Sequence, residues 1–246
     1  MPALLLSVCF HDGRYHGLPD WPPSPARLFQ ALVAGAARGA ALEPADAEAL
    51  EWLGKRGAPI IAAPHARRGE SFTNFVPNND LDAVGGDPKR VSEIRAGKTI
   101  RPMLFDAGAP LLYVWRFDRS DEMLAKRICA IAERLYQLGR GVDMAWATGE
   151  IVGDDKAVDD RFAVYNGVVC RPSGGGEGRT FAVPLNGSLQ SLIARFEGGR
   201  ARFERTRSNR SEQTLFKQPP KARFRQVAYN SPPRRLLFEL HDTALE

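Results

Sequence analysis

The order of strand and helix patterns in the first 150 residues constrains the fold more than any other feature of this chain. Apolar runs and amphipathic periods predict, in chain order, strand 4–10, helices 25–38 and 44–55, strands 59–63 and 111–117, helix 120–138 and strand 142–152. Strand, helix, strand, strand, helix, strand is the ferredoxin-like βαββαβ order, which RNA-recognition modules share. We therefore expect an α+β fold of this kind, although fold alone does not establish function.

The first helix has a well-marked start. Three prolines within four residues hold the approaching chain extended, Ser24 suits the N-cap, and Pro25 suits the first helical position. Apolar residues such as Leu28 and Phe29 form one stripe of helical period. Arg27 lies off that stripe, so we expect it to face solvent or a ligand.

The composition is that of a globular protein, with 43% hydrophobic and 26% charged residues. No apolar run is long enough to cross a bilayer, and the N-terminal strand lacks the basic start of a signal peptide. Cys9, Cys129 and Cys170 are widely spaced, which indicates reduced thiols. The four histidines show no ligand spacing. We expect a cytoplasmic protein with no metal, no cofactor and no membrane contact.

Basic residues concentrate in residues 201–235, which contain ten Lys/Arg against two acidic residues, whereas the rest of the chain holds 24 basic and 27 acidic residues. Aromatic residues are interleaved with these cations, which suits phosphates and unstacked bases. A solvated basic strand edge is the structural alternative. Around this segment, strands are predicted over 162–170, 180–184 and 224–229, and a helix over 188–196. The predicted RNA contacts here are Arg205, Arg207, Arg210, Lys217, Lys221, Arg223 and Arg225.

Residues 66–108 form a long polar excursion between the second and third predicted strands. The stretch has no sustained period, and loops of this length inside a compact domain are usually functional or mobile. A solvated loop is the simple interpretation, and a thumb-like hairpin that follows an RNA backbone is the functional one. Its predicted RNA contacts are Lys89, Arg90, Arg95, Lys98 and Arg101.

Four short motifs in a fixed order add a family resemblance over about the first 150 residues. In one-letter code they are WPPSPARLFQALV at 21–33, FVPNND at 75–80, LYVW at 112–115 and LGRGVD at 138–143. In this order they resemble a CRISPR-associated RAMP family of the type I-U (I-G) system. The resemblance implies a subunit that binds the 5′ handle of crRNA in the Cascade interference complex, in antiviral defence.

The resemblance also implies a domain organisation and partners. Full-length members of the family carry a C-terminal endoribonuclease that cuts the repeat, and this chain is similar to the N-terminal, handle-binding half. We expect a RAMP domain over 1–153 with its thumb at about 66–108, and a β-rich basic portion over 154–246 that leads toward the endoribonuclease. The implied partners are the crRNA 5′ handle, the backbone and large subunits of the effector and, in the assembled complex, target DNA.

The remaining candidates lie near the first strand and in a glycine-rich turn. Arg14, Tyr15 and Arg27 are predicted to contact RNA or a neighbouring subunit, and Arg140 to touch phosphate from its Gly-Arg-Gly turn. The rival function is a metal-independent endoribonuclease that processes pre-crRNA, with His11 or His16 as the acid–base residue. A basic ferredoxin-like adaptor with no RNA role is a third possibility. Our expectation is that this chain binds RNA without performing chemistry on it.

Overall fold

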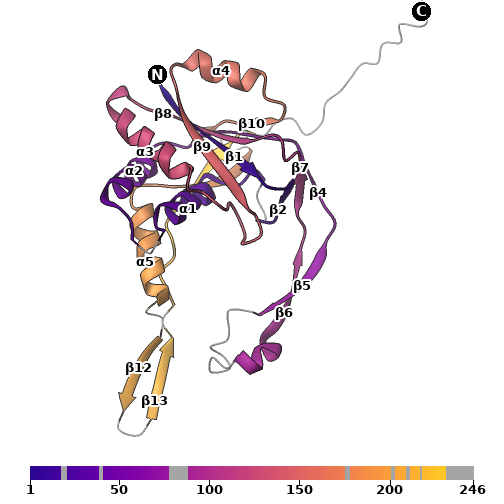
Figure 1. Cartoon of the computed structure of the whole chain (residues 1–246), viewed down its shortest axis with the longest axis vertical. Coiled ribbons are helices and arrows are strands. Elements are labelled where there is room, and N and C mark those ends of the chain that lie inside the picture. Colours follow the sequence, from indigo (N-terminus) through magenta and orange to yellow (C-terminus); the bar gives the residue numbers. More distant parts are fainter. Residues whose placement is uncertain are drawn as a thin grey trace, which may run out of the picture.

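A five-stranded antiparallel sheet forms the centre of the molecule (Figure 1). The computed structural model describes residues 1–17, 21–38, 41–77, 88–174, 178–200, 203–208, 211–216 and 218–230. The sheet order is β10 (Val168–Cys170), β3 (Ile60–Ala63), β8 (Leu111–Arg116), β1 (Ala3–Phe10) and β9 (Ala145–Val152). Without β10, this is the antiparallel order that a βαββαβ unit produces, which confirms the expected α+β fold.

Three helices cover one face of this sheet: α1 (Pro25–Ala36), α2 (Pro44–Lys55) and α3 (Glu122–Ala132). Alternate residues of β1, such as Leu4 and Leu6, point into the core under these helices. Gly149 lets α3 approach β9 closely, because a Cβ at this position would lie 2.6 Å from the Cα of Cys129. The larger of the two hydrophobic cores therefore lies between these helices and the sheet.

The other face of the sheet is only partly covered. At one end of the sheet, Val158 and Phe162 of helix α4 (Asp155–Ala163) pack against Leu5 and Val114. Farther along β9, Trp146 is 48% exposed. In register, Trp146 lies opposite Cys9 of β1, on the same face as Leu5. This face therefore has a small second core at one end and an exposed aromatic side chain toward the other.

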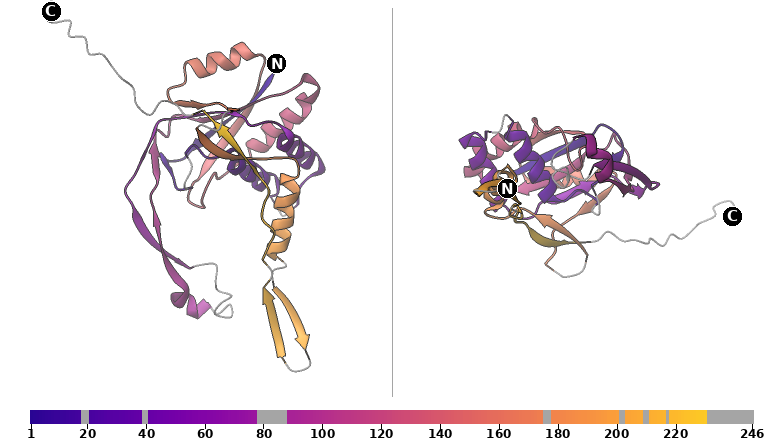
Figure 2. Two further views of the ribbon diagram at one scale, coloured as in Figure 1. Left: turned by 180° about the vertical axis from the view of Figure 1, so that it is seen from behind. Right: turned by 90° about the horizontal axis from the view of Figure 1, so that it is seen from below.

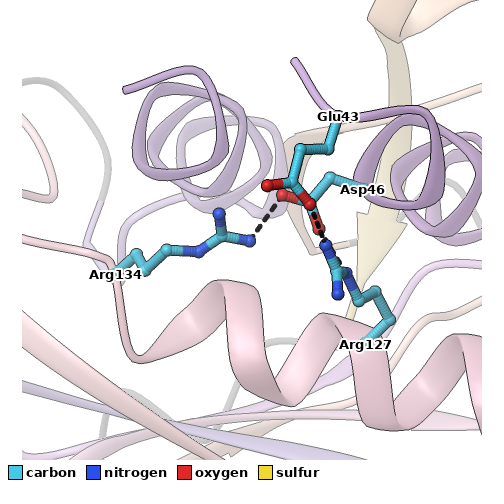
Figure 3. Close-up of polar contacts among 4 residues, drawn as sticks. All are labelled: Glu43, Asp46, Arg127 and Arg134. Carbon is cyan, nitrogen blue, oxygen red and sulfur yellow. Dashed lines mark hydrogen bonds and ion pairs between the residues drawn. The ribbon is translucent and has the colours of Figure 1, made fainter. Parts of the chain in front are cut away.

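A buried carboxylate links α2 to α3 (Figure 3). The Asp46 side chain is completely buried and accepts hydrogen bonds from Arg127 and, at 2.6 Å, from the Nη2 of Arg134. Arg127 also donates to the exposed Glu43 at 2.6 Å. The hydrogen bonds to the Asp46 carboxylate raise the pKa of Arg127, so this guanidinium stays charged. The cluster stabilises the helix layer above the sheet.

The C-terminal part of the chain shares the main core. Strands β11 (Arg179–Val183) and β14 (Arg225–Tyr229) form a small antiparallel sheet. Phe181 and Tyr229 belong to the same buried cluster as β1, and the Tyr229 hydroxyl donates to the carbonyl of Pro59 at 2.9 Å. The core is therefore continuous across the boundary predicted at residue 153.

Two arms extend to the same side of the body (Figures 1 and 2). The first arises from the predicted excursion, and the second is α5 followed by a hairpin. Near the body, β7 (Met103–Phe105) pairs with β2 (Arg14–Tyr15) and β4 (Ala66–Arg68). The first arm continues as β5 (Phe72–Pro77), the 3-10 helix η2 (Pro88–Ile94) and β6 (Arg95–Ile100), and the second comprises α5 (Ser188–Arg200), β12 (Phe203–Ser208) and β13 (Ser211–Phe216).

The largest differences in extent concern two predicted elements. The helix predicted over 120–138 ends at Ala132, and beyond it the carbonyl of Arg134 accepts a 3.0 Å hydrogen bond from Arg38, which follows α1. The strand predicted over 162–170 begins only at Val168, because residues 155–163 form α4. That helix starts where the carboxylate of Asp154 accepts from the backbone N–H of Ala157 at 2.8 Å.

Candidate nucleic-acid interface

The outer face of α1 lines a cavity of about 150 Å³ against the loop between α3 and β9. The apolar stripe of α1 faces the core, which leaves positions at helical spacing on the outside. Two of these positions are alanines, and their short side chains leave room beside the helix. The lining residues are Arg27, Gln30, Ala31, Ala34, Tyr136, Gln137 and Gly139.

A buried carboxylate holds the Gly-Arg-Gly turn at the rim of this cavity. Asp143 is 1% exposed and accepts hydrogen bonds from the backbone N–H and the ring Nδ1 of His16, both at 2.8 Å. It also accepts from the backbone N–H of Arg140 at 2.6 Å. Gly139 has φ +130°, and a Cβ there would lie 2.3 Å from Asp143 Oδ2. The turn therefore requires glycine at this position, and it presents the exposed side chain of Arg140.

A second cavity, of about 540 Å³, shares the lining residue Gln30 with the first. Arg195 of α5, Lys221 and the apolar residues Leu192 and Phe224 also line it. No Asp or Glu is among the described residues that line either cavity. The charged side chains that line the two cavities are therefore all basic, and the second cavity also has apolar lining residues.

The chain between α5 and β14 is held beside this second cavity by two serine hydroxyls. Ser188 Oγ donates to the carbonyl of Arg223 at 2.7 Å, and the N–H of Arg223 donates to Ser191 Oγ at 2.9 Å. Both backbone groups of Arg223 are thus satisfied, while its side chain is exposed. Lys221, two residues earlier, is positioned by the same anchored segment.

The first arm carries an exposed aromatic ring among cations. Phe75 is 72% exposed, and its ring lies over Gly97 of the paired strand, where a Cβ would be 3.4 Å from the ring. On the same face, the hydroxyls of Thr73 and Thr99 lie 3.1 Å apart. Arg95 is also on this face, opposite the end of β5. A ring beside hydroxyls and a guanidinium can stack on a base and hold its phosphate.

The five cations predicted for this arm have different environments. Arg90 donates to both carboxylate oxygens of Glu93, at 2.9 and 2.7 Å, which lowers the pKa of that carboxyl group. Arg101 donates to the carbonyl of Gly69 at 2.8 Å. Lys89 is exposed next to this pair. Among the described residues, Arg95 and Lys98 are exposed and form no ion pair, so these two are the cations of the arm best placed to meet a phosphate.

The other predicted contacts are spread over the molecule. Arg14 is exposed on β2, whereas Tyr15 is only 1% exposed, because its ring packs against Phe10 and Trp21 in the core. Arg225 is exposed on β14. Arg205 and Arg207 belong to β12, and Arg210 and Lys217 lie outside the described residues.

The two histidines of the rival function differ in exposure. His11 is exposed just after β1. His16 is buried, its Nδ1 is bonded to Asp143, and its ring meets the edge of Phe72 on the first arm at 6.2 Å between centroids. The structure thus places His16 in a carboxylate–histidine pair and leaves His11 on the surface.

Sequence reasoning missed four residues of the two cavities: Gln30, Tyr136, Gln137 and Arg195. Gln30 could have been found, since it lies on the same outer face of the predicted helix as Arg27. Tyr136 and Gln137 were assigned to a helix that ends before them, whereas Arg195 lies inside the helix predicted over 188–196, where no pattern singles it out.

Three further features concern membrane spans, metal clusters and thiols. None of the helices in the described part of the chain combines the length and apolar character required to cross a membrane. Within the same residues, no cluster of three or more His, Cys, Asp or Glu could hold a metal ion. Cys9, Cys129 and Cys170 are free, and burial raises the pKa of each thiol.

Comparisons with known proteins bear on this interface. A search of curated proteins found no significant match. One solved structure, described as "Crystal structure of a CRISPR protein from Archaeoglobus fulgidus", is 14% identical, with a TM-score of 0.33 over 75% of this chain and 79% of the other. The sequence pattern of the CRISPR-associated GSU0054 family matches residues 3–242. The chain belongs to this family of CRISPR-associated proteins.

Proposed function

We propose that this chain is a crRNA-binding structural subunit of a type I-U/I-G Cascade complex that grips the 5′ handle of the crRNA. The observation that carries the proposal is the pair of cavities that share Gln30 of α1, where Arg27, Arg195 and Lys221 are found with no acidic residue among the described lining residues. Cations grouped in this way attract a polyanion, and the apolar lining residues of the second cavity suit unstacked bases. Membership of a CRISPR-associated family makes RNA the natural polyanion.

The two arms supply the rest of the proposed mechanism. They extend from the body on the same side, and the first carries Phe75 and the exposed cations Arg95 and Lys98. In this proposal the strand follows the cavities along α1, and the first arm contacts it beyond the body and meets the first backbone subunit. The subunit then caps the filament of the effector. Binding is electrostatic and steric, and requires no chemistry on the RNA.

A salt titration tests this binding mode. Each phosphate contact to a single strand contributes about −0.7 to the slope of log affinity against log salt. The double variant Arg195→Gln/Lys221→Gln should therefore flatten the slope for repeat-derived RNA by about 1.4, measured by fluorescence anisotropy. Lys55→Gln/Lys156→Gln removes the same charge from exposed positions elsewhere and should change the slope little. Equal slopes for the two variants, or no RNA binding by the wild-type chain, would refute the proposal.

The endoribonuclease remains a second candidate because of one observation. The bond of 2.8 Å from His16 Nδ1 to the buried Asp143 is the arrangement by which a carboxylate orients an acid–base histidine. Against it, the His16 ring is nearly inaccessible, whereas proton transfer requires contact with the reacting hydroxyl. Incubation of the chain with repeat RNA in EDTA separates the two functions. Defined cleavage that is lost in His16→Asn, which retains a side-chain donor for Asp143, would establish the enzyme, and so would loss in His11→Ala.

A further inference from the structure

The smaller cavity on α1 has the form of a site for one nucleotide. Resting on the proposed function, we propose that it receives a single unstacked purine base of the bound RNA strand and gives the subunit a base preference at one position. Its volume of about 150 Å³ corresponds to roughly five water molecules of about 30 Å³ each, which is space for one planar base. The positive charge of the arms acts on phosphates of any sequence, so it predicts no base preference of this kind.

The side chains around the cavity match the edges of a purine. Arg27, Gln30 and Gln137 present a guanidinium and two amides. An amide pairs with the N6 and N7 atoms of adenine, and a guanidinium pairs with the O6 and N7 atoms of guanine. These neighbouring atoms are found only on purines. Pyrimidines have no N7, so they cannot form these two pairs.

Tyr136 adds an aromatic ring to the cavity lining, and one arginine lies over it. The ring is 45% exposed, and the guanidinium of Arg38 lies over it, 5.5 Å from its centroid. Arg140 is exposed and directly follows Gly139, which lines the same cavity. A base that stacks on an aromatic ring brings its phosphate to the edge of the site, where these guanidinium groups can neutralise it.

The site is preorganised by hydrogen bonds within the protein, which are present before any RNA binds. Three hydrogen bonds to the carboxylate of Asp143 hold the turn, and the positive φ of Gly139 sets its shape. The α1 wall is a regular helix whose far side is buried in the core. A rigid site loses little entropy on binding, so it discriminates between bases better than a mobile loop.

The cavity also shares a lining residue with the rest of the proposed RNA path. Gln30 lines both cavities, so a nucleotide in the smaller one has its neighbour beside Arg195 and Lys221. The larger cavity offers cations and apolar side chains, which any nucleotide can contact. Base preference should therefore be confined to one position and absent at the next.

A filled-cavity variant tests the inference with the full chain. Ala34→Leu adds three carbons to the cavity wall at an exposed helix position, where leucine is a good helix former. Ala130→Leu makes the same change on the exposed side of α3 and is the matched control. Each protein is mixed with a random 12-nucleotide RNA library, and the bound fraction is sequenced. Wild type and Ala130→Leu should enrich purines at one position by about tenfold, the usual effect of one good base contact.

The outcomes separate the inference from the proposed function. Ala34→Leu should lose the enriched position, and Gln137→Ala should weaken that enrichment. A wild-type chain that binds the library with no enriched position refutes the purine site and leaves the proposed function standing. Enrichment that persists in Ala34→Leu also refutes the purine site and leaves the proposed function standing. A chain that binds no RNA refutes both. Melting curves confirm that each variant is folded.

Discussion

The carboxylate of Asp143 is expected to be among the most important single side chains for the stability of this protein. It is buried and accepts three hydrogen bonds, from two donors of His16 and from the backbone N–H of Arg140, at 2.6 to 2.8 Å. Asp143→Ala removes the acceptor of all three. The donors of His16 are then left buried, whereas the partly buried N–H of Arg140 can turn to water.

The size of the loss follows from these partners. A buried donor left without an acceptor costs about 1–3 kcal/mol, and there are two of them on His16. We therefore expect Asp143→Ala to lower the free energy of unfolding by about 3–4 kcal/mol. For a chain of this length that lowers Tm by roughly 10 °C.

Asp106→Ala is the matched control. Asp106 also accepts a backbone N–H in a turn, from Gly108 at 2.9 Å, but it is exposed. Its removal should cost about 0.5–1 kcal/mol, as for an exposed cap. Urea unfolding of both variants, followed by circular dichroism, measures the difference. If Asp143→Ala is no more destabilising than Asp106→Ala, the reasoning from burial is wrong.

Three further predictions concern the turn, a thiol and the helix layer. Gly139→Ala should lower the free energy of unfolding by at least about 2 kcal/mol, because Gly139 has a positive φ and the new Cβ would lie 2.3 Å from a carboxylate oxygen. Gly141→Ala is the control and should be neutral in the same urea assay, because no atom lies within 4 Å of its new Cβ. Burial raises the pKa of the Cys129 thiol to about 11, so the reactive thiolate is about 0.1% of the total at pH 8 and grows as pH rises. Iodoacetamide labelling followed by peptide mass spectrometry should be about a hundredfold slower there than for an ordinary thiol, and rapid labelling would contradict this. Asp46→Asn should lower Tm more than Glu43→Gln, because only the first carboxylate is buried, and equal shifts would count against the burial argument.

The backbone plan of the sheet could be predicted from periodicity alone. Strands such as residues 111–117 alternate or run apolar, and α1 begins at the proline that its sequence places there. Patterns of this kind are local, because each residue's burial follows from its neighbours in the same element. The end of α3 was not predicted, because the apolar period continues to Leu138, whereas the backbone N–H groups of Arg134 and Leu135 bond to carbonyls three residues earlier and tighten the chain after Ala132.

The candidate site was predicted only in part for a similar reason. Arg27 could be placed off the apolar stripe of its helix, since helical geometry decides that from sequence. Its neighbours Gln137 and Tyr136 come from a loop more than one hundred residues away, and no pattern in either segment indicates the other. Tyr15 illustrates the reverse case, since a polar aromatic residue in a basic stretch is buried by Trp21 and Phe10.

By itself, the sequence determined the fold class, the reduced cysteines and the concentration of positive charge, because these depend on composition and on periods within single elements. Only the tertiary structure decided which charges meet. It paired Asp46 with Arg127 and Arg134, bonded the buried Asp143 to His16, and placed Gln30 of α1 and Arg195 of α5 around one cavity. The physical reason is that a binding surface is a property of side chains brought together across the core, and the packing that brings them together is not encoded in any one segment.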